Sequence, residues 1–195
     1  MDAGAGAALA LLLVGGGLAG LLASWVITID ELKLLADPNF TPGCSMNPVV
    51  SCGNIMKSDQ ATVFGFPNPL LGLVAYAVVT LVGVALLAGA TLRRWFWLGL
   101  NSGALLGVLF CTWLQYQSLY SINSLCLWCC LAWAATIVVF WSVTAHNVRS
   151  GMLFRASAPR AFFDELALVP PLLHVGIIAM LILTRWWDFW TSSHS

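Results

Sequence analysis

The sequence carries very little charge. Only 8% of its 195 residues are Asp, Glu, Lys or Arg, against about a quarter in an ordinary soluble domain. Hydrophobic residues make up 60% of the chain, so too few polar residues remain to cover a surface that faces water. The charges sum to zero and form neither a basic stripe nor an acidic tail, so nucleic acid is excluded as a partner. We therefore expect an integral membrane protein in contact with lipid.

Five hydrophobic segments are long enough to cross a bilayer, which takes roughly 20 apolar residues. They cover residues 7–29, 69–92, 96–119, 125–145 and 166–183. The first segment lacks the basic start of a signal peptide, and its apolar stretch is too long for one, so we expect it to be a helix. The sequence predicts an all-α membrane protein, with a bundle of four transmembrane helices and a fifth transmembrane helix.

The arginines predict how this bundle is oriented. Two of them separate the second and third segments and three separate the fourth and fifth: Arg93, Arg94, Arg149, Arg155 and Arg160. Connections rich in arginine stay in the cytoplasm, which places the N-terminus inside and the C-terminus outside. The outer loop 30–68 and the start of the fourth segment then share the outer face. We expect a core over residues 1–146, a cytoplasmic connection over 147–165, and a fifth helix with an outer tail over 166–195.

Glycines recur at four-residue spacing in two of the segments. Gly16 and Gly20 lie in the first segment, and Gly99, Gly103 and Gly107 lie in the third. Small residues at this spacing let transmembrane helices approach closely. We predict that both sets pack against neighbouring helices.

Two cysteines three residues apart stand at the start of the fourth segment. Cys126 and Cys129 share one face of a helix and can close a disulfide. Ser124 is a candidate N-cap, which puts Cys126 in the first turn, where the helix dipole favours the reactive thiolate. The sequence thus predicts a reactive dithiol at the mouth of a membrane helix. Cys130 meets the same geometric condition, so helix geometry alone does not choose between Cys129 and Cys130.

A second pair of cysteines lies in the outer loop. Cys44 and Cys52 can be joined by a disulfide, and the segment 54–64 that follows can form a short helix on the bilayer surface, covering the bundle. Loop cysteines by themselves indicate a structural disulfide. Because this loop shares a membrane face with Cys126 and Cys129, we interpret the two pairs as an electron relay by thiol–disulfide exchange.

At this point the chain resembles the vitamin K epoxide reductase family in its bacterial form. The resemblance covers roughly residues 7–146 and rests on these elements: Cys44-x7-Cys52, Ser58, Phe64-Gly65-Phe66-Pro67-Asn68-Pro69, Gly72, Tyr76 and Cys126-x-x-Cys129. It implies a four-helix bundle around a quinone. It also implies that Cys129 reacts with the quinone, Cys126 exchanges with Cys52, and Cys44 takes electrons from an outside partner.

The same resemblance suggests which residues bind the quinone, either menaquinone or ubiquinone. Asn68 matches the family position that hydrogen-bonds a quinone oxygen. Trp133 stands where the family often has tyrosine, and an indole can donate one hydrogen bond but cannot accept one. Tyr76 and Trp128 complete the expected set. Metal ligands are not expected, because histidine is scarce on the outer face.

We therefore predict a bacterial plasma-membrane enzyme that passes electrons from a separate thioredoxin-like (DsbA-like) protein to a quinone, supporting disulfide formation in exported proteins. The resemblance departs from fused family members, since we expect no thioredoxin-like domain in this chain. Two alternatives remain open. One is the vitamin K epoxide or quinone reductase activity of animal relatives, and the other is a non-catalytic membrane scaffold whose cysteines resist alkylation.

Overall fold

The computed structural model describes residues 3–153 and 160–192, and within them the chain is helical and has no β-strand. The long helices are α1 (Ala3–Ala36), α3 (Pro69–Leu87), α4 (Arg94–Tyr116), α5 (Leu127–Arg149) and α6 (Arg160–Arg185). The short elements are α2 (Cys52–Met56), η1 (Asp59–Thr62), η2 (Gln117–Ile122) and α7 (Trp187–Ser192). Parts of the predicted connection (residues 154–159) and of the outer tail (residues 193–195) lie outside the described residues.

All five predicted membrane helices are present. The five long helices are each long and apolar enough to cross a bilayer, so the prediction of an all-α membrane protein is confirmed. The first helix continues to Ala36, seven residues beyond the predicted end at Ile29. Asp30 and Glu31 therefore belong to α1, and the outer loop begins later than predicted.

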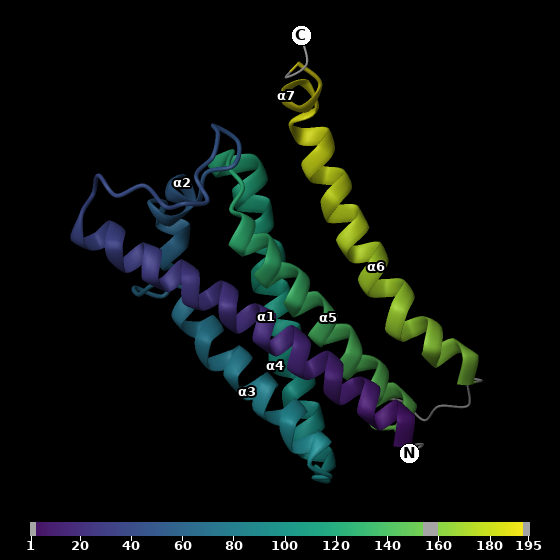
Figure 1. Cartoon of the computed structure of the whole chain (residues 1–195). Helices are drawn as coiled ribbons and strands as arrows, with labels where there is room; N and C mark the ends of the chain where they lie inside the picture. The colour runs from purple at the N-terminus through teal and green to yellow at the C-terminus, as the bar shows by residue number, and fades with distance from the viewer. Residues whose placement is uncertain (1–2, 154–159, 193–195) are drawn as a thin grey trace.

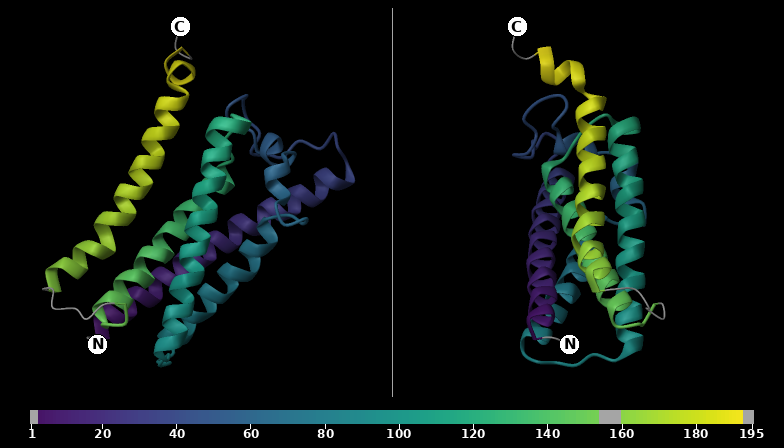
Figure 2. Two further views of the ribbon diagram at one scale, coloured as in Figure 1. Left: turned by 180° about the vertical axis from the view of Figure 1, so that it is seen from behind. Right: turned by 90° about the vertical axis from the view of Figure 1, so that its right-hand side faces the viewer.

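The helices form an open bundle. α1 packs closely on α3 and α5, α4 packs on α5, and α6 runs along α5. Over the described residues, α3 and α4 hardly touch each other. The described ends of the chain lie at opposite ends of the bundle, and the loop that carries α2 lies at the C-terminal end (Figures 1 and 2). We refer to that end as the mouth.

The prediction about glycine packing is right for α1 and wrong for most of α4. A Cβ atom at Gly20 would collide with the ring of Tyr76, and one at Gly16 would lie 3.0 Å from Val139 Cγ2. At Gly99 and Gly103, by contrast, a Cβ atom would meet nothing within 4 Å. The spacing predicts close helix packing only where a second helix is present, and α3 does not come close to α4.

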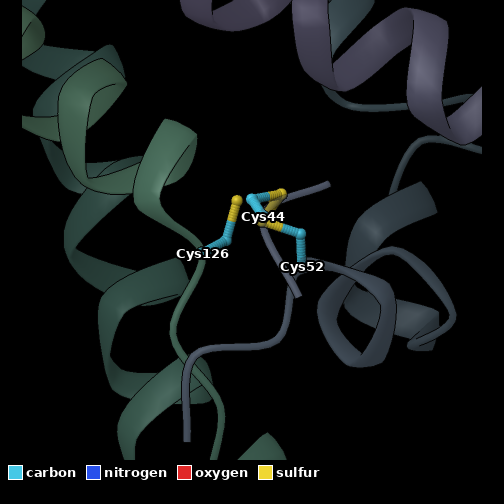
Figure 3. A group of neighbouring side chains, drawn as sticks. All are labelled: Cys44, Cys52 and Cys126. Carbon is cyan, nitrogen blue, oxygen red and sulfur yellow. A yellow bond between two sulfur atoms is a disulfide. The ribbon is translucent and has the colours of Figure 1, made fainter. Parts of the chain in front are cut away.

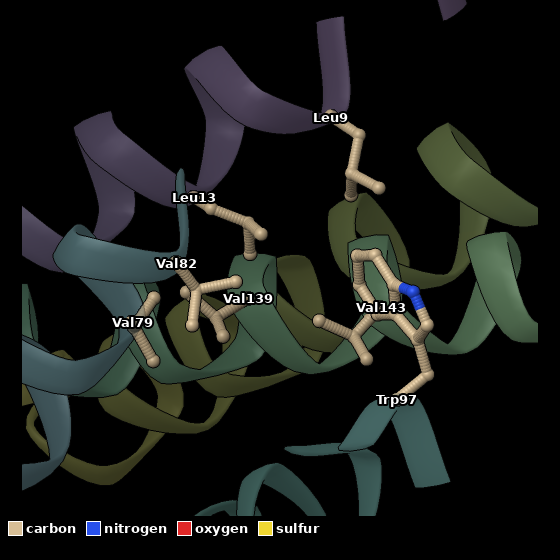
Figure 4. Close-up of a cluster of buried hydrophobic side chains, with 7 residues drawn as sticks. All are labelled: Leu9, Leu13, Val79, Val82, Trp97, Val139 and Val143. Atoms are coloured by element: carbon tan, nitrogen blue, oxygen red, sulfur yellow. The ribbon is translucent and has the colours of Figure 1, made fainter. Parts of the chain in front are cut away.

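A hydrophobic cluster closes the end of the bundle opposite the mouth. It joins α1, α3, α4 and α5 through Leu9, Leu13, Val79, Val82, Trp97, Val139 and Val143 (Figure 4). Next to it, the buried Asn147 side chain donates hydrogen bonds to the carbonyl of Trp97 (3.1 Å) and to Asn101 Oδ1 (3.0 Å). These two bonds satisfy the amide nitrogen of Asn147 and fix α5 against α4, while its Oδ1 is buried without a hydrogen-bond partner among the described residues. At the mouth, this cluster does not hold the helices together, and they lie further apart (Figure 2).

Candidate redox site

A short backbone bridge brings the outer loop to the start of α5. Val50 and Leu125 form an isolated parallel bridge, in which the Leu125 N–H donates to the Val49 carbonyl (2.7 Å) and the Ser51 N–H donates to the Leu125 carbonyl (2.9 Å). Cys52 follows Val50 by two residues, and Cys126 follows Leu125 by one. The bridge therefore delivers the two cysteines to the same place.

This bridge also changes where α5 begins. Ser124 was predicted to be the N-cap, but Leu125 stays extended in the bridge, and the helix starts at Leu127 with Cys126 as its N-cap residue. The Ser124 hydroxyl instead accepts a hydrogen bond from Asn54 Nδ2 (3.0 Å). Cys126 Sγ takes the part usually played by a capping oxygen and accepts from the Cys129 N–H at 3.3 Å. The sulfur thus sits at the positive end of the helix, as predicted, but one step before its first turn.

Three sulfur atoms meet at the mouth. Cys44 and Cys52 are joined in a disulfide, and the sulfurs of Cys44, Cys52 and Cys126 all lie within 4.8 Å of one another. Figure 3 shows the Cys126 sulfur pointing at the loop disulfide. Cys126 and Cys129 are free thiols. This proximity favours thiol–disulfide exchange, in which one thiolate attacks a disulfide sulfur.

The surroundings of Cys126 favour its thiolate. A hydrogen bond from the Cys129 thiol lowers the pKa of Cys126, burial opposes this, and the backbone N–H groups of Cys129 and Trp128 lower the pKa further. Together, these effects lower the pKa of Cys126 below that of an ordinary thiol. A lower pKa increases the fraction of the nucleophilic form at neutral pH.

A large apolar cavity lies behind the dithiol. Its volume is about 880 Å³, within the range of roughly 300–1,000 Å³ that is usual for small-molecule sites. It occupies the space between α3 and α4, and the α2–η1 segment covers its outer end. Cys129 lines this cavity. The predicted short covering segment is therefore present, as α2 and η1.

The glycine in the Phe64-Gly65-Phe66 motif shapes this cover. Gly65 has a φ of +80°, a conformation that glycine adopts without steric cost. The turn brings the ring of Phe64 to 5.6 Å from the ring of Phe110 on α4. The cover thus reaches across the gap between α3 and α4.

Asn68 has an unsatisfied atom at the cavity. Its Nδ2 donates to the Gln60 carbonyl at 2.7 Å, while its Oδ1 is buried without a hydrogen-bond partner among the described residues. Asn68 lines the cavity. A buried amide oxygen without a partner is costly, and a ligand hydroxyl such as that of a quinol would satisfy it. A quinone also matches the apolar walls of the cavity, so the residues present fit this class of ligand.

Tyr76 lines the cavity too, but its hydroxyl is engaged. It donates to the Ala132 carbonyl at 2.8 Å and lies 2.6 Å from the Thr136 hydroxyl. Cys111 Sγ in turn lies 3.6 Å from Thr136 Oγ1. A quinone oxygen only accepts hydrogen bonds, so Tyr76 would have to release one of these partners to bind it. In this structure, the network ties α3 to α5. Thr136 has no motif around it, and sequence reasoning missed it.

The two tryptophans predicted to contact the ligand lie in different places. Trp133 is buried and lines the cavity. Trp128 packs instead against the cluster that contains Cys44, Cys52 and Cys126. Cys130 lines a separate cavity of about 130 Å³ between α5 and α6. The structure thus separates Cys129 from Cys130, which helix geometry alone left equivalent.

The fifth helix holds the segment that leads into the dithiol. Arg185, at the end of α6, donates from Nε to the Leu119 carbonyl at 3.1 Å and from Nη2 to Asn123 Oδ1. Asn123 ends η2 with a φ of 55°, and the chain then runs directly into the bridge at Leu125. We had no sequence signal for this contact, because it joins residues more than 60 positions apart.

The fold and the site together define an all-α, multi-pass membrane protein with a cysteine cluster at the mouth of an apolar cavity. A comparison with protein-family models matches residues 11–144 to the vitamin K epoxide reductase family. The chain belongs to that family, whose members are membrane oxidoreductases of thiols and quinones. A search of curated proteins finds no match.

Proposed function

We infer that the protein is a quinone-linked thiol oxidoreductase that supplies disulfides to exported proteins. Electrons pass from a thioredoxin-like partner to Cys44 and Cys52, then to Cys126 and Cys129, and finally to a quinone. The observation that carries this proposal is the cluster of three sulfurs within 4.8 Å. It joins the loop disulfide to a dithiol whose other member, Cys129, lines the cavity.

The cysteines act in a fixed order. One thiolate of the partner dithiol attacks Cys44 and frees Cys52, and the second partner thiolate then releases Cys44. Cys52 attacks a Cys126–Cys129 disulfide at Cys126 and releases Cys129 as a thiolate. Cys44 finally attacks Cys52, which closes the loop disulfide again and frees Cys126. Each exchange breaks one S–S bond and forms another. A bound quinone supplies the acceptor for the two electrons that leave the dithiol when Cys126 and Cys129 join again. Asn68, whose Oδ1 could accept a hydrogen bond from the quinol form, and Trp133 would hold this group, and Cys129 lines the same cavity. In the proposed order, a loop disulfide beside a free helical dithiol, the pairing that the structure has, is the form that would deliver electrons to the acceptor.

The loop also determines how a partner gains access. Cys44 is buried, while its neighbours Gly43 and Met46 are exposed. No atom would lie within 4 Å of a Cβ at Gly43, so the surface beside Cys44 is open. We propose that the partner docks on this open surface and displaces the loop enough to reach the sulfur. The loop and the mouth then face the outside of a bacterial plasma membrane, in the orientation that the arginines predict.

The test uses purified protein in detergent with menadione and a reduced thioredoxin-like protein, with quinol formation followed by absorbance. We expect wild type to turn over and Cys126→Ala to be inactive. Cys52→Ala should lose oxidation of the protein partner but retain oxidation of a small dithiol that reaches Cys126 directly. A mixed disulfide between Cys52 and Cys126 should accumulate when the two cysteines that would resolve it, Cys44 and Cys129, are replaced by alanine.

A non-catalytic scaffold predicts a different pattern. In that case Cys126 and Cys129 would resist alkylation, and their alanine variants would change only thermal stability. Quinol formation that is equal in wild type and Cys126→Ala would refute the proposed relay.

A further inference from the structure

We propose that Glu31 is a proton-transferring residue of the quinone cavity. This inference rests on the proposed function, and it concerns how protons accompany the electrons. Glu31 is 3% exposed, it lines the large cavity, and its Oε2 is buried without a hydrogen-bond partner among the described residues. It is the only carboxylic acid that lines this cavity in the part of the chain that the structure describes.

The position of Glu31 follows from the helical repeat of α1. Ile27 and Leu34 lie four residues before it and three after it, on the same face, and both pack in the cluster that contains Cys44, Cys52 and Cys126. Glu31 therefore faces the redox site, from the outer end of α1. Its neighbour Asp30 is oriented differently and pairs with Lys33 at 3.8 Å.

An unpaired carboxyl in this position is costly. Burying an ionisable group without a partner is unfavourable, and such residues inside membrane helices generally mark a pathway for protons or substrate. A leucine would fit an apolar face better, so packing does not explain why an acid stands here. Proton transfer does explain it, because a carboxyl group can both give and take a proton.

The proposed step balances in atoms and electrons. Closing the Cys126–Cys129 disulfide breaks two S–H bonds, forms one S–S bond, and releases two electrons and two protons. Reducing the quinone to the quinol consumes the same two electrons and two protons. Glu31 gives one proton to the ligand and recovers one from the dithiol, so it is unchanged after each turnover. The second proton passes from the dithiol to the ligand without Glu31.

Other groups around the cavity must be considered in any pH dependence. Tyr76 on α3, Cys111 on α4 and Cys129 on α5 line the same cavity. Asp30 and Lys33 flank Glu31 on its own helix. Tyr76 is engaged with the Ala132 carbonyl, which leaves Glu31 as the acid without a fixed partner.

The experiment compares wild type, Glu31→Gln, Glu31→Asp and Asp37→Asn in lipid nanodiscs, with menadione and a small dithiol. Asp37→Asn makes the same change from carboxyl to amide on an exposed side chain outside the cavity and is the matched control. We expect Glu31→Gln to bind menadione with the affinity of wild type, measured by quenching of tryptophan fluorescence. Its kcat should fall roughly 100-fold, the usual size of a general acid–base effect. Glu31→Asp should fall between Glu31→Gln and wild type, and Asp37→Asn should match wild type.

A second readout does not depend on turnover. The reduced-minus-oxidised infrared difference spectrum of wild type should contain a carboxylic acid C=O band that Glu31→Gln lacks and Asp37→Asn keeps. If Glu31→Gln keeps both its kcat and this band while wild type is active, the role of Glu31 is refuted and the relay stands. If wild type itself makes no quinol, the proposed function fails and this inference fails with it.

Discussion

Replacing Gly103 by leucine should block the cavity without weakening the fold. Gly103 lies on α4 at the cavity wall, and a Cβ atom there would meet nothing within 4 Å. The new side chain therefore enters open space rather than a neighbouring helix. Glycine is a poorer helix former than alanine by about 0.8–1.0 kcal/mol in water, and leucine ranks just below alanine, so the stability of the variant should be unchanged or higher.

The size of the effect follows from how apolar pockets discriminate. One misplaced methylene in such a pocket changes binding by roughly 1–3 kcal/mol, or about 10–200-fold. Leucine introduces several carbon atoms between α3 and α4, in the gap through which a lipid-soluble ligand would enter. We expect the KM for menadione to rise by at least about tenfold, with a smaller change in kcat.

The assay measures quinol formation with a small dithiol, over a range of menadione concentrations, together with the thermal unfolding midpoint. Gly176→Leu is the matched control. Gly176 lies on α6, it too has nothing within 4 Å of a Cβ position, and it is outside the cavity. Both variants should unfold at or above the wild-type temperature, and only Gly103→Leu should raise KM. An unchanged KM in Gly103→Leu would show that the ligand does not use the space between α3 and α4.

Four further outcomes follow from the site and its supports. Cys129→Ser should abolish quinol formation and Cys130→Ser should leave it near wild type; the reverse result would mean that the thiol facing the ligand is Cys130. Gly20→Ala should lower the free energy of unfolding by about 1–3 kcal/mol, the usual cost of overpacking, because the new methyl group collides with the ring of Tyr76; an unchanged unfolding midpoint would contradict this. Arg185→Ala should lower stability by about 1 kcal/mol, less than the ~1.5–3 kcal/mol of a hydrogen bond to a charged group, since the side chain is exposed. It should also speed alkylation of Cys126; equal alkylation rates would show that the hydrogen bonds of Arg185 to Leu119 and Asn123 do not hold the segment before Cys126. The lowered pKa of Cys126 predicts that iodoacetamide still reacts with it below pH 8.5, where an ordinary thiol, with a pKa of about 8.5, is mostly protonated. Cys129→Ala should shift this pH profile upwards, because Cys126 loses the hydrogen bond from the Cys129 thiol.

Several features could be read from the sequence because they depend on local composition. The five membrane helices follow from apolar segments that are long enough to cross a bilayer, and their starts agree within a few residues with the structure. The prediction of family membership is confirmed as well. It could be made from the sequence because the cysteine spacing and the motif that contains Asn68 are local sequence patterns. The roles of the individual cysteines remain predictions.

Where local signals competed with distant partners, the sequence was less informative. Serine is a common N-cap residue, so Ser124 was a reasonable candidate. Leu125, however, forms a backbone bridge with Val49 and Val50, and a residue held in an extended conformation cannot begin a helix. The predicted end of the first helix, Ile29, is too early, because the two acidic residues that follow it favour a loop when only the sequence is considered. In the structure the acid at position 31 is buried on the helix face that meets the cysteines.

By itself, the sequence determined that this is a membrane protein of five helices with two cysteine pairs on one side. Segment length, charge and spacing are properties of the chain read in order, and they suffice for that. Only the tertiary structure decided that Cys129 and not Cys130 faces the large cavity, that Gly99 and Gly103 of α4 line open space, and that Arg185 supports the redox segment. Each of these depends on which helix stands opposite, and the distance between helices is not encoded in the spacing along one of them.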